Sequence, residues 1–209
     1  MRILVLRRTA AALVLAAAVV AGAAPAAAAA TAGDWPCVQR KMPHLSLGQM
    51  WSGPAAKGDW RDDREIRDLA NRLASRRVPL DEAETLVVTF AAAAGAAKAD
   101  RLALLFAGAF DVIEGERAKV MTGIERYSKR QQGLADRIRE EDEKLAALKR
   151  SSDGSTTASD AAEDAQSALD WDTRIYQERE QSLTYVCEVP VLFEQRAFAL
   201  ARIIMKHLE

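Results

Sequence analysis

The apolar positions between residues 116 and 150 recur at alternating intervals of four and three residues. This seam consists of Val120, Ile124, Tyr127, Gln131, Leu134, Ile138, Glu141, Leu145 and Leu148. Seven of these nine residues are apolar or Tyr, and charged residues occupy the other faces. Such a heptad pattern predicts a long coiled-coil helix. From Arg117 to Arg150 the helix would extend roughly 50 Å, at 1.5 Å per residue.

A second apolar seam follows after the polar stretch SSDGSTTASD at residues 151–160. It consists of Ala165, Leu169, Tyr176, Leu183, Val186, Phe193, Ala197, Leu200 and Ile204. Because the intervening residues favour a turn, the two seams predict an antiparallel coiled-coil hairpin over about residues 116–190. Pro190 removes one backbone donor inside the second helix, so we expect a kink there.

Shorter helical patterns precede the hairpin. Residues 62–76 carry one apolar stripe, and Pro79 ends this helix. The stripe consists of Ile66, Leu69, Ala70 and Leu73. Residues 80–95 and the apolar stretch 102–113 also fit helices, which would form a base for the hairpin. No strand pattern competes with them, so we predict an all-α fold with residues 61–209 as one helical domain.

Residues 31–60 contain no periodic stretch longer than one turn, and Pro and Gly interrupt them repeatedly. We therefore expect an irregular N-terminal wrap in front of the helical domain. Its large apolar side chains are Trp35, Trp51 and Trp60, which we interpret as anchors that hold the wrap to the helices. The alternative interpretation is that the three rings line an aromatic ligand pocket.

Residues 1–30 have the layout of a secretory signal peptide. Three Arg residues near the start precede an apolar run from Ala10 to Ala24, and small residues after Pro25 offer cleavage sites. The run is about fifteen residues long, short of the roughly 20 that span a bilayer, although an uncleaved membrane anchor is the alternative. We predict a periplasmic or secreted protein that keeps no integral membrane segment once the signal is removed.

Removal of the leader makes the chain more acidic. The leader carries three Arg and no acidic residue, so the 29 Lys and Arg of the chain fall to 26, against 30 Asp and Glu. The resulting net charge near −4 favours solubility. It argues against a nucleic-acid partner, which would need a basic face.

The chain contains two cysteines, Cys37 and Cys187, at a separation of 150 positions. In an exported protein such a pair most simply forms one disulfide, with free thiols or intermolecular pairing as the alternatives. In the chain-entropy model so long a loop stabilises the fold by up to about 5 kcal/mol. Since no C-x-x-C motif is present, we expect a structural bond that ties the wrap to the C-terminal helix.

The sequence carries no recognisable catalytic or cofactor motif. There is no H-E-x-x-H, G-x-S-x-G, Walker or Rossmann pattern, and the two His residues lie far apart. The acidic run 140–143 would point in four directions on a helix, and residues 153–164 lack the acids of a calcium loop. We therefore assign no catalytic, cofactor or metal residue and expect a protein that is not an enzyme.

The hairpin suggests a protein-binding or scaffold module. Its polar tip would offer Ser152, Asp153, Thr156 and Thr157 to a protein partner, and self-association through the hairpin is also compatible with the heptads. The alternative is a carrier of a small ligand or metal ion, with a cavity in the base. That alternative rests on the Ala- and Gly-rich helices around Ala91 to Ala109, which leave room between backbones.

Overall fold

Helices provide the regular structure of residues 35–151 and 156–208, the part of the chain that the computed structural model describes. The elements are α1 (Leu47–Met50), α2 (Arg64–Ala74), α3 (Leu80–Ala93), the 3-10 turn η1 (Gly95–Ala97), α4 (Lys98–Ser151) and α5 (Thr156–Met205). These residues contain no strand, which confirms the all-α class. The predicted leader and the tip residues Ser152 and Asp153 lie outside the described residues.

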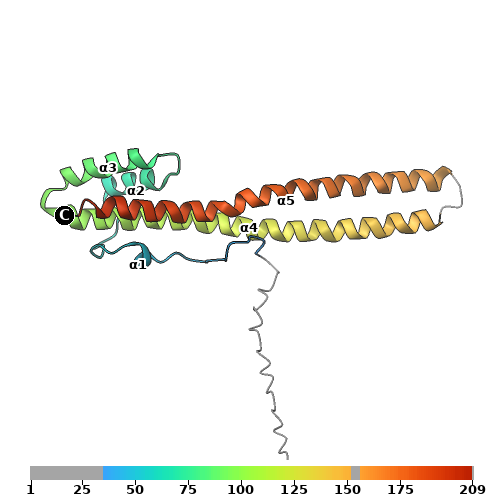
Figure 1. Ribbon diagram of the computed structural model, residues 1–209, viewed down its shortest axis with the longest axis horizontal. Coiled ribbons are helices and arrows are strands. Elements are labelled where there is room, and N and C mark those ends of the chain that lie inside the picture. The colour runs from blue at the N-terminus through green and yellow to red at the C-terminus, as the bar shows by residue number, and fades with distance from the viewer. Residues whose placement is uncertain (1–34, 152–155, 209) are drawn as a thin grey trace, which may run out of the picture. The chain divides into compact units, whose positions relative to one another are not determined.

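Helices α4 and α5 run side by side as the predicted hairpin (Figure 1). All nine positions of the first seam are buried or half-buried, which confirms the heptad pattern on α4. The second seam is correct at Leu169, Tyr176 and Leu183 but wrong at Val186, whose exposed fraction is 41%. The seam passes through the buried Cys187 instead, one residue further along α5.

The first helix of the hairpin begins well before the predicted start of the hairpin at about residue 116. Its 54 residues start at Lys98, so the apolar stretch 102–113 is the first part of α4. Gly115 lies between the apolar stretch 102–113 and the predicted start of the hairpin. One glycine inside a helix costs only about 1 kcal/mol relative to Ala and does not end the helix. The helix is therefore about 80 Å long at 1.5 Å per residue, and its first third belongs to the base.

The base buries one apolar core between α2, α3, the start of α4 and the end of α5. Its largest fully buried side chains include Ile66, Leu73, Val87, Leu102, Leu105, Phe106, Ile113, Leu200 and Ile204. Asp63 begins α2, and its side chain accepts a hydrogen bond from the Ile66 amide at 3.1 Å. At the other end Arg196 of α5 donates its Nε–H to the Leu73 carbonyl at 2.7 Å. Burial lowers the pKa of Arg196, whose charge suits this helix C-terminus.

Two tryptophans fix the wrap on the base, as predicted. The Trp51 ring stacks on Phe106 with 4.6 Å between centroids, and both Trp51 and Trp60 are buried. Trp60 covers Gly108, where an added Cβ would lie 2.9 Å from the indole ring. The glycine is needed for this close approach. The rings of Trp51 and Trp60 thus pack against other parts of the protein. Trp35, near the start of the wrap, is half-buried.

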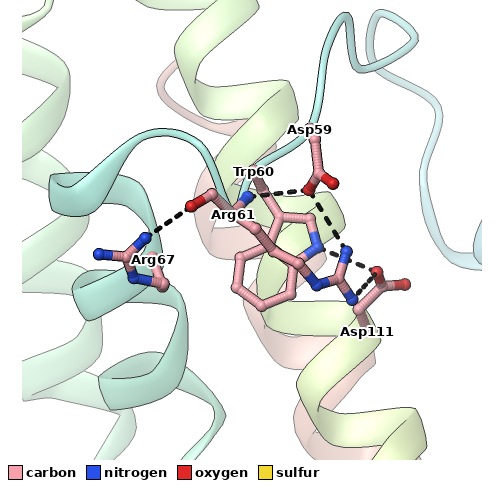
Figure 2. A network of polar contacts seen from close by, with 5 residues as sticks. All are labelled: Asp59, Trp60, Arg61, Arg67 and Asp111. Atoms are coloured by element: carbon pink, nitrogen blue, oxygen red, sulfur yellow. Dashed lines mark hydrogen bonds and ion pairs between the residues drawn. The ribbon is translucent and has the colours of Figure 1, made fainter.

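A polar network joins the end of the wrap to two helices (Figure 2). Trp60 donates its Nε1–H to Asp111 on α4 at 3.0 Å, and the Arg61 guanidinium lies 4.3 Å from the Trp60 ring centroid. The Arg61 carbonyl accepts a 2.6 Å hydrogen bond from Arg67 on α2. Hydrogen bonding from the Arg61 backbone amide lowers the pKa of Asp59. These contacts surround an indole whose polar atom would otherwise be buried without a partner.

None of the described helices is both long enough and apolar enough for a membrane crossing.

Candidate functional site: the hairpin arm and its junction

The arm joins the base at a disulfide. Cys37 of the wrap and Cys187 of α5 are bonded, with 5.5 Å between their Cα atoms, which confirms the predicted pairing. Pro190 lies one turn further along, inside α5, where it interrupts the backbone hydrogen bonds of the helix. Figure 1 shows α5 changing direction where its colour passes from orange to red. The wrap is thus attached to α5 close to the bend.

A buried ion pair also holds the wrap at this junction. Arg117 of α4 is 2% exposed and donates hydrogen bonds to the carbonyls of Met42 and Pro43. One turn earlier, Glu114 accepts a hydrogen bond from the Leu45 amide at 3.1 Å and lies 3.5 Å from the Arg117 guanidinium. The pair therefore satisfies backbone groups of an irregular segment that has no ladder of its own.

The sequence did not predict the role of Arg117 and Glu114. Their partners are main-chain atoms of the wrap. Every residue carries such atoms, so the pattern of side chains along the sequence does not reveal these contacts. The only available signal was the spacing of an acid and a base at i and i+3 beside the seam, which also describes many exposed pairs. Lys41 adds a more exposed pair to Glu125 at 2.6 Å, one step further along the arm.

Further out, side chains of α4 bind the backbone of α5. Gln131 donates from Nε2 to the Tyr176 carbonyl at 3.2 Å, and Tyr127 donates its hydroxyl to the Arg179 carbonyl at 2.8 Å. Burial raises the pKa of Tyr127, because the phenolate would be desolvated there. Each bond exists only when the two helices have this one alignment.

A charged pair repeats this arrangement nearer the tip. Arg137 of α4 donates a hydrogen bond to Asp172 of α5, and it also lies 3.9 Å from Glu141. Asp172 is 8% exposed, whereas the Arg137 side chain keeps 57% of its surface exposed. The hydrogen bond to Asp172 raises the pKa of Arg137. Polar groups in a seam cost stability and select one register, so these contacts define the alignment of the arm.

The structure places half of the predicted tip. Thr156 and Thr157 form the first turn of α5, and both are exposed. On the other helix, Lys149 and Arg150 lie in the last turn of α4, and Ser151 donates its hydroxyl to main-chain carbonyls of that turn. The described part of the tip thus offers hydroxyl and basic groups at the end of two aligned helices (Figure 1).

The base has two openings among the described residues, and one of them borders the Ala-rich stretch at Ala93. One cavity of about 380 Å³ lies between α2 and α3, and another of about 480 Å³ lies beside the end of α2. The second is lined by polar and apolar side chains that include Arg76, Arg77, Val112, Glu116 and Phe193. In the stretch Ala91 to Ala109 the small residues permit close packing, and Ala103 and Ala109 are fully buried.

Residues that would support catalysis or metal binding are scarce. Across residues 35–151 and 156–208, no group of three or more His, Cys, Asp and Glu side chains is placed to hold a metal ion. His44 is exposed, and its Nδ1 lies 3.4 Å from Glu114 at the junction. His207, near the end of α5, is half-buried.

Comparisons of this chain with protein-family models, with curated proteins and with solved structures find no match. Its function has to be inferred from the arm, the junction and the base themselves.

Proposed function

We propose that this chain is an exported, non-enzymatic helical protein that binds another protein through the hairpin arm. The observation that carries the proposal is the arm itself, in which polar contacts across the seam align α4 with α5. The disulfide and the signal-like residues 1–30 support export, because such bonds persist in oxidising compartments.

The chemistry of the seam favours a role beyond stability. A buried Asp172 and a buried Gln131 stabilise an arm less than apolar residues of similar size would. They do restrict the two helices to one register, and with it the position of the tip relative to the base. An arm of roughly 50 Å beyond Arg117, with its end held in a defined place, suits recognition at a distance.

The tip supplies the groups for recognition. Thr156 and Thr157 present hydroxyls that both donate and accept hydrogen bonds, and Lys149 and Arg150 add positive charge beside them. The residues that follow Arg150 in the sequence, Ser151, Ser152 and Asp153, are polar as well. A protein partner with a polar and partly acidic surface matches this chemistry best.

Site-specific photo-crosslinking in the producing cell tests the proposal. A photoreactive residue in place of Thr156 should give a discrete adduct with a second protein. The same residue in place of Glu140, which is exposed midway along the arm, is the matched control and should give none. Replacing residues 145–165 by a short Gly linker should abolish capture. Capture that survives this deletion, or adducts from Glu140 alone, would rule out recognition at the tip.

A second candidate function is a small-ligand carrier, which the cavity of about 480 Å³ favours. Its lining combines two guanidinium groups, Arg76 and Arg77, with the apolar Phe193 and Val112. This combination suits a ligand that has a carboxylate and an apolar part. A panel of such acids, screened for shifts in the unfolding temperature, tests the idea. The shift should vanish in an Arg76→Ala/Arg77→Ala variant, and no shift with any acid would exclude the carrier.

A further inference from the structure

A third heptad series lies on the outside of α5. Starting at Ala168, every third or fourth residue is apolar or aromatic except for two polar residues at the centre. We call this series the outer α5 stripe; it consists of Ala168, Trp171, Ile175, Glu178, Ser182, Tyr185, Val189 and Leu192. Its intervals are 3, 4, 3, 4, 3, 4 and 3 residues, a coiled-coil pattern over more than three heptads.

Most of the stripe is exposed, and only Ile175 and Val189 are half-buried. Exposed fractions are 61% for Trp171, 75% for Tyr185 and 45% for Leu192, which are large for residues of this kind. The wrap reaches α5 on a neighbouring face, beside Glu180 and Thr184, and borders the stripe only at its flank, at Glu188. On the base side, coverage ends where Arg76, just beyond α2, lies over the Phe193 ring at 5.1 Å. The α4–α5 hairpin therefore leaves one apolar face of α5 in solvent.

The order of residues along the stripe is self-complementary. In the stripe, Ala168, Ile175, Ser182 and Val189 occupy heptad position a, and the other four residues occupy position d. In an antiparallel pair of identical helices, position a of one copy faces position d of the other. Stripe residues whose numbers sum to 360 then face each other. The two-fold axis passes between Glu178 and Ser182, at the level of Glu180 along the helix. The resulting layers are Ala168 with Leu192, Trp171 with Val189, Ile175 with Tyr185, and Glu178 with Ser182. Each apolar residue meets an apolar or aromatic residue, and the two polar residues meet each other.

The flanking charges fit the same alignment. Arg174 and Glu188 precede stripe residues by one position and lie on the same flank. Residues that directly precede position a flank the stripe, and in the antiparallel pair they face each other when their numbers sum to 362. Arg174 of each copy therefore meets Glu188 of the other, and Gln181 meets Gln181 next to the axis. Neither Arg174 nor Glu188 makes an ion pair within the described part of the chain. Two copies of Arg179 approach on the opposite flank, each with Glu178 beside it.

We propose that two copies of this protein associate antiparallel through the outer α5 stripe, about a two-fold axis at Glu180. The inference deepens the proposed function, since it rests on the arm as the binding surface and names a second copy as one partner. It places self-association on the side of the arm rather than at the tip. The tip of each copy would then point toward the base of the other.

A cysteine scan of the purified, disulfide-bonded protein tests the alignment. Gln181→Cys should form a covalent dimer under mild oxidation, because the two copies of residue 181 meet at the axis. Gln177→Cys is the matched control: Gln177 is also exposed and one turn away, but lies outside the paired face, and should stay a monomer on a denaturing gel. Equal crosslinking of both variants, or crosslinking of Gln177→Cys alone, would overturn the proposed alignment.

Sedimentation measurements without new cysteines test the association itself. The wild-type protein should show a concentration-dependent dimer in the micromolar range, and Tyr185→Glu should be monomeric. Val88→Glu places the same charge on an exposed apolar residue of α3, away from the stripe, and should leave the dimer unchanged. Circular dichroism would verify that both variants fold. A wild-type monomer throughout this range, or a dimer in Tyr185→Glu as strong as in wild type, would overturn the proposal.

A charge exchange separates this surface from other modes of dimerisation. Arg174→Glu alone should weaken the dimer severalfold, because it places two carboxylates against each other. The double variant Arg174→Glu/Glu188→Arg should restore wild-type affinity only if the two residues meet across the interface. Failure of this rescue would contradict the pairing. None of these results depends on an adduct from Thr156, so the tip and the stripe can fail separately.

Discussion

At the scale of single residues, Arg117 shows how a buried charge can serve an irregular segment. Its guanidinium faces the carbonyls of Met42 and Pro43 and the carboxylate of Glu114. The wrap has few backbone hydrogen bonds of its own, so this one side chain replaces part of a missing ladder. The cost of burying the cation is met only while all these acceptors stay in place.

Removing this cation should therefore destabilise the fold strongly. We expect Arg117→Met to lower the free energy of unfolding by about 3 kcal/mol, because it leaves two carbonyls without their donor and Glu114 without its counter-charge. Urea denaturation followed by circular dichroism measures the change. Arg130→Met, at an exposed position of the same helix, is the control and should stay within about 0.5 kcal/mol of wild type. Equal effects of the two substitutions would contradict a special role for Arg117.

Tyr127 should make stability depend on alkaline pH. Burial raises its pKa above the ordinary value of 10.0, so the neutral hydroxyl is the form that the folded arm prefers. Its contribution is fully present below the unfolded value and is lost as pH rises through the folded value. Unfolding free energies between about pH 8 and about pH 12 should fall more for wild type than for Tyr127→Phe. An identical pH dependence of wild type and Tyr127→Phe would contradict the expectation.

The contacts of single residues could be predicted only where they followed from the heptad repeat or from the number of cysteines. The two cysteines could be paired because the chain has only two and its first residues predict an export leader. The polar seam positions Gln131 and Glu141 were visible because they interrupt a heptad. Asp172 and Arg137 were not visible, since their contact depends on how one helix is aligned with the other.

At the scale of elements, the arm combines weak pairing with a defined register. Gln131 and Asp172 both occupy buried positions that apolar side chains would fill more favourably. Gln131 also has a buried Oε1 atom with no hydrogen-bond partner among the described residues. The two residues thus lower the stability of the helix pair and still permit only one alignment.

Replacing both should raise stability and loosen the alignment. We expect Gln131→Leu/Asp172→Leu to increase the free energy of unfolding by about 1 kcal/mol, because two polar groups leave the seam. Spin labels at the exposed Lys144 and Glu163 report the register as an interhelical distance. That distance should be single in wild type and broadened in the variant. A single distance in both proteins would show that the apolar positions suffice to align the arm.

Helix boundaries were predictable to the extent that local chemistry sets them. The seam and the turn gave the hairpin, and the predicted helices 62–76 and 80–95 exceed α2 and α3 by at most two residues at either end. The hairpin was started too late because the charged Arg117 interrupts the heptad, which continues before it at Phe106, Phe110 and Ile113. Tertiary packing against α2 and the wrap, rather than pairing with α5 alone, determines that part of the helix.

At the scale of the whole molecule, the wrap contains only the short helix α1 and is held at both ends. The Trp60 network fixes its end to α2 and α4, and the disulfide fixes its start to α5. The sequence indicated both attachments in kind, through the tryptophans and the cysteines. It contained no information on the path between them, because that path is set by contacts with Glu114, Arg117 and Glu125.

Loss of the disulfide should affect the molecule as a whole. We expect Cys37→Ala/Cys187→Ala to lower the free energy of unfolding by up to about 5 kcal/mol, since the bond closes a loop of 150 positions. Chemical denaturation with and without a reductant measures this effect. The reductant should destabilise wild type and leave the double variant unchanged. An equal response of the two proteins would mean that the bond contributes nothing in solution.

The same bond changes what a single cleavage does to the chain. Cys37 and Cys187 close a covalent ring, so hydrolysis of any one peptide bond between them opens the ring without releasing a fragment. The two pieces stay linked through sulfur and remain packed along the α4–α5 seam. A nicked molecule would migrate as one band on a denaturing gel and separate into two only after reduction. A protein that meets proteases outside the cytoplasm would thus survive a first cut as a single particle.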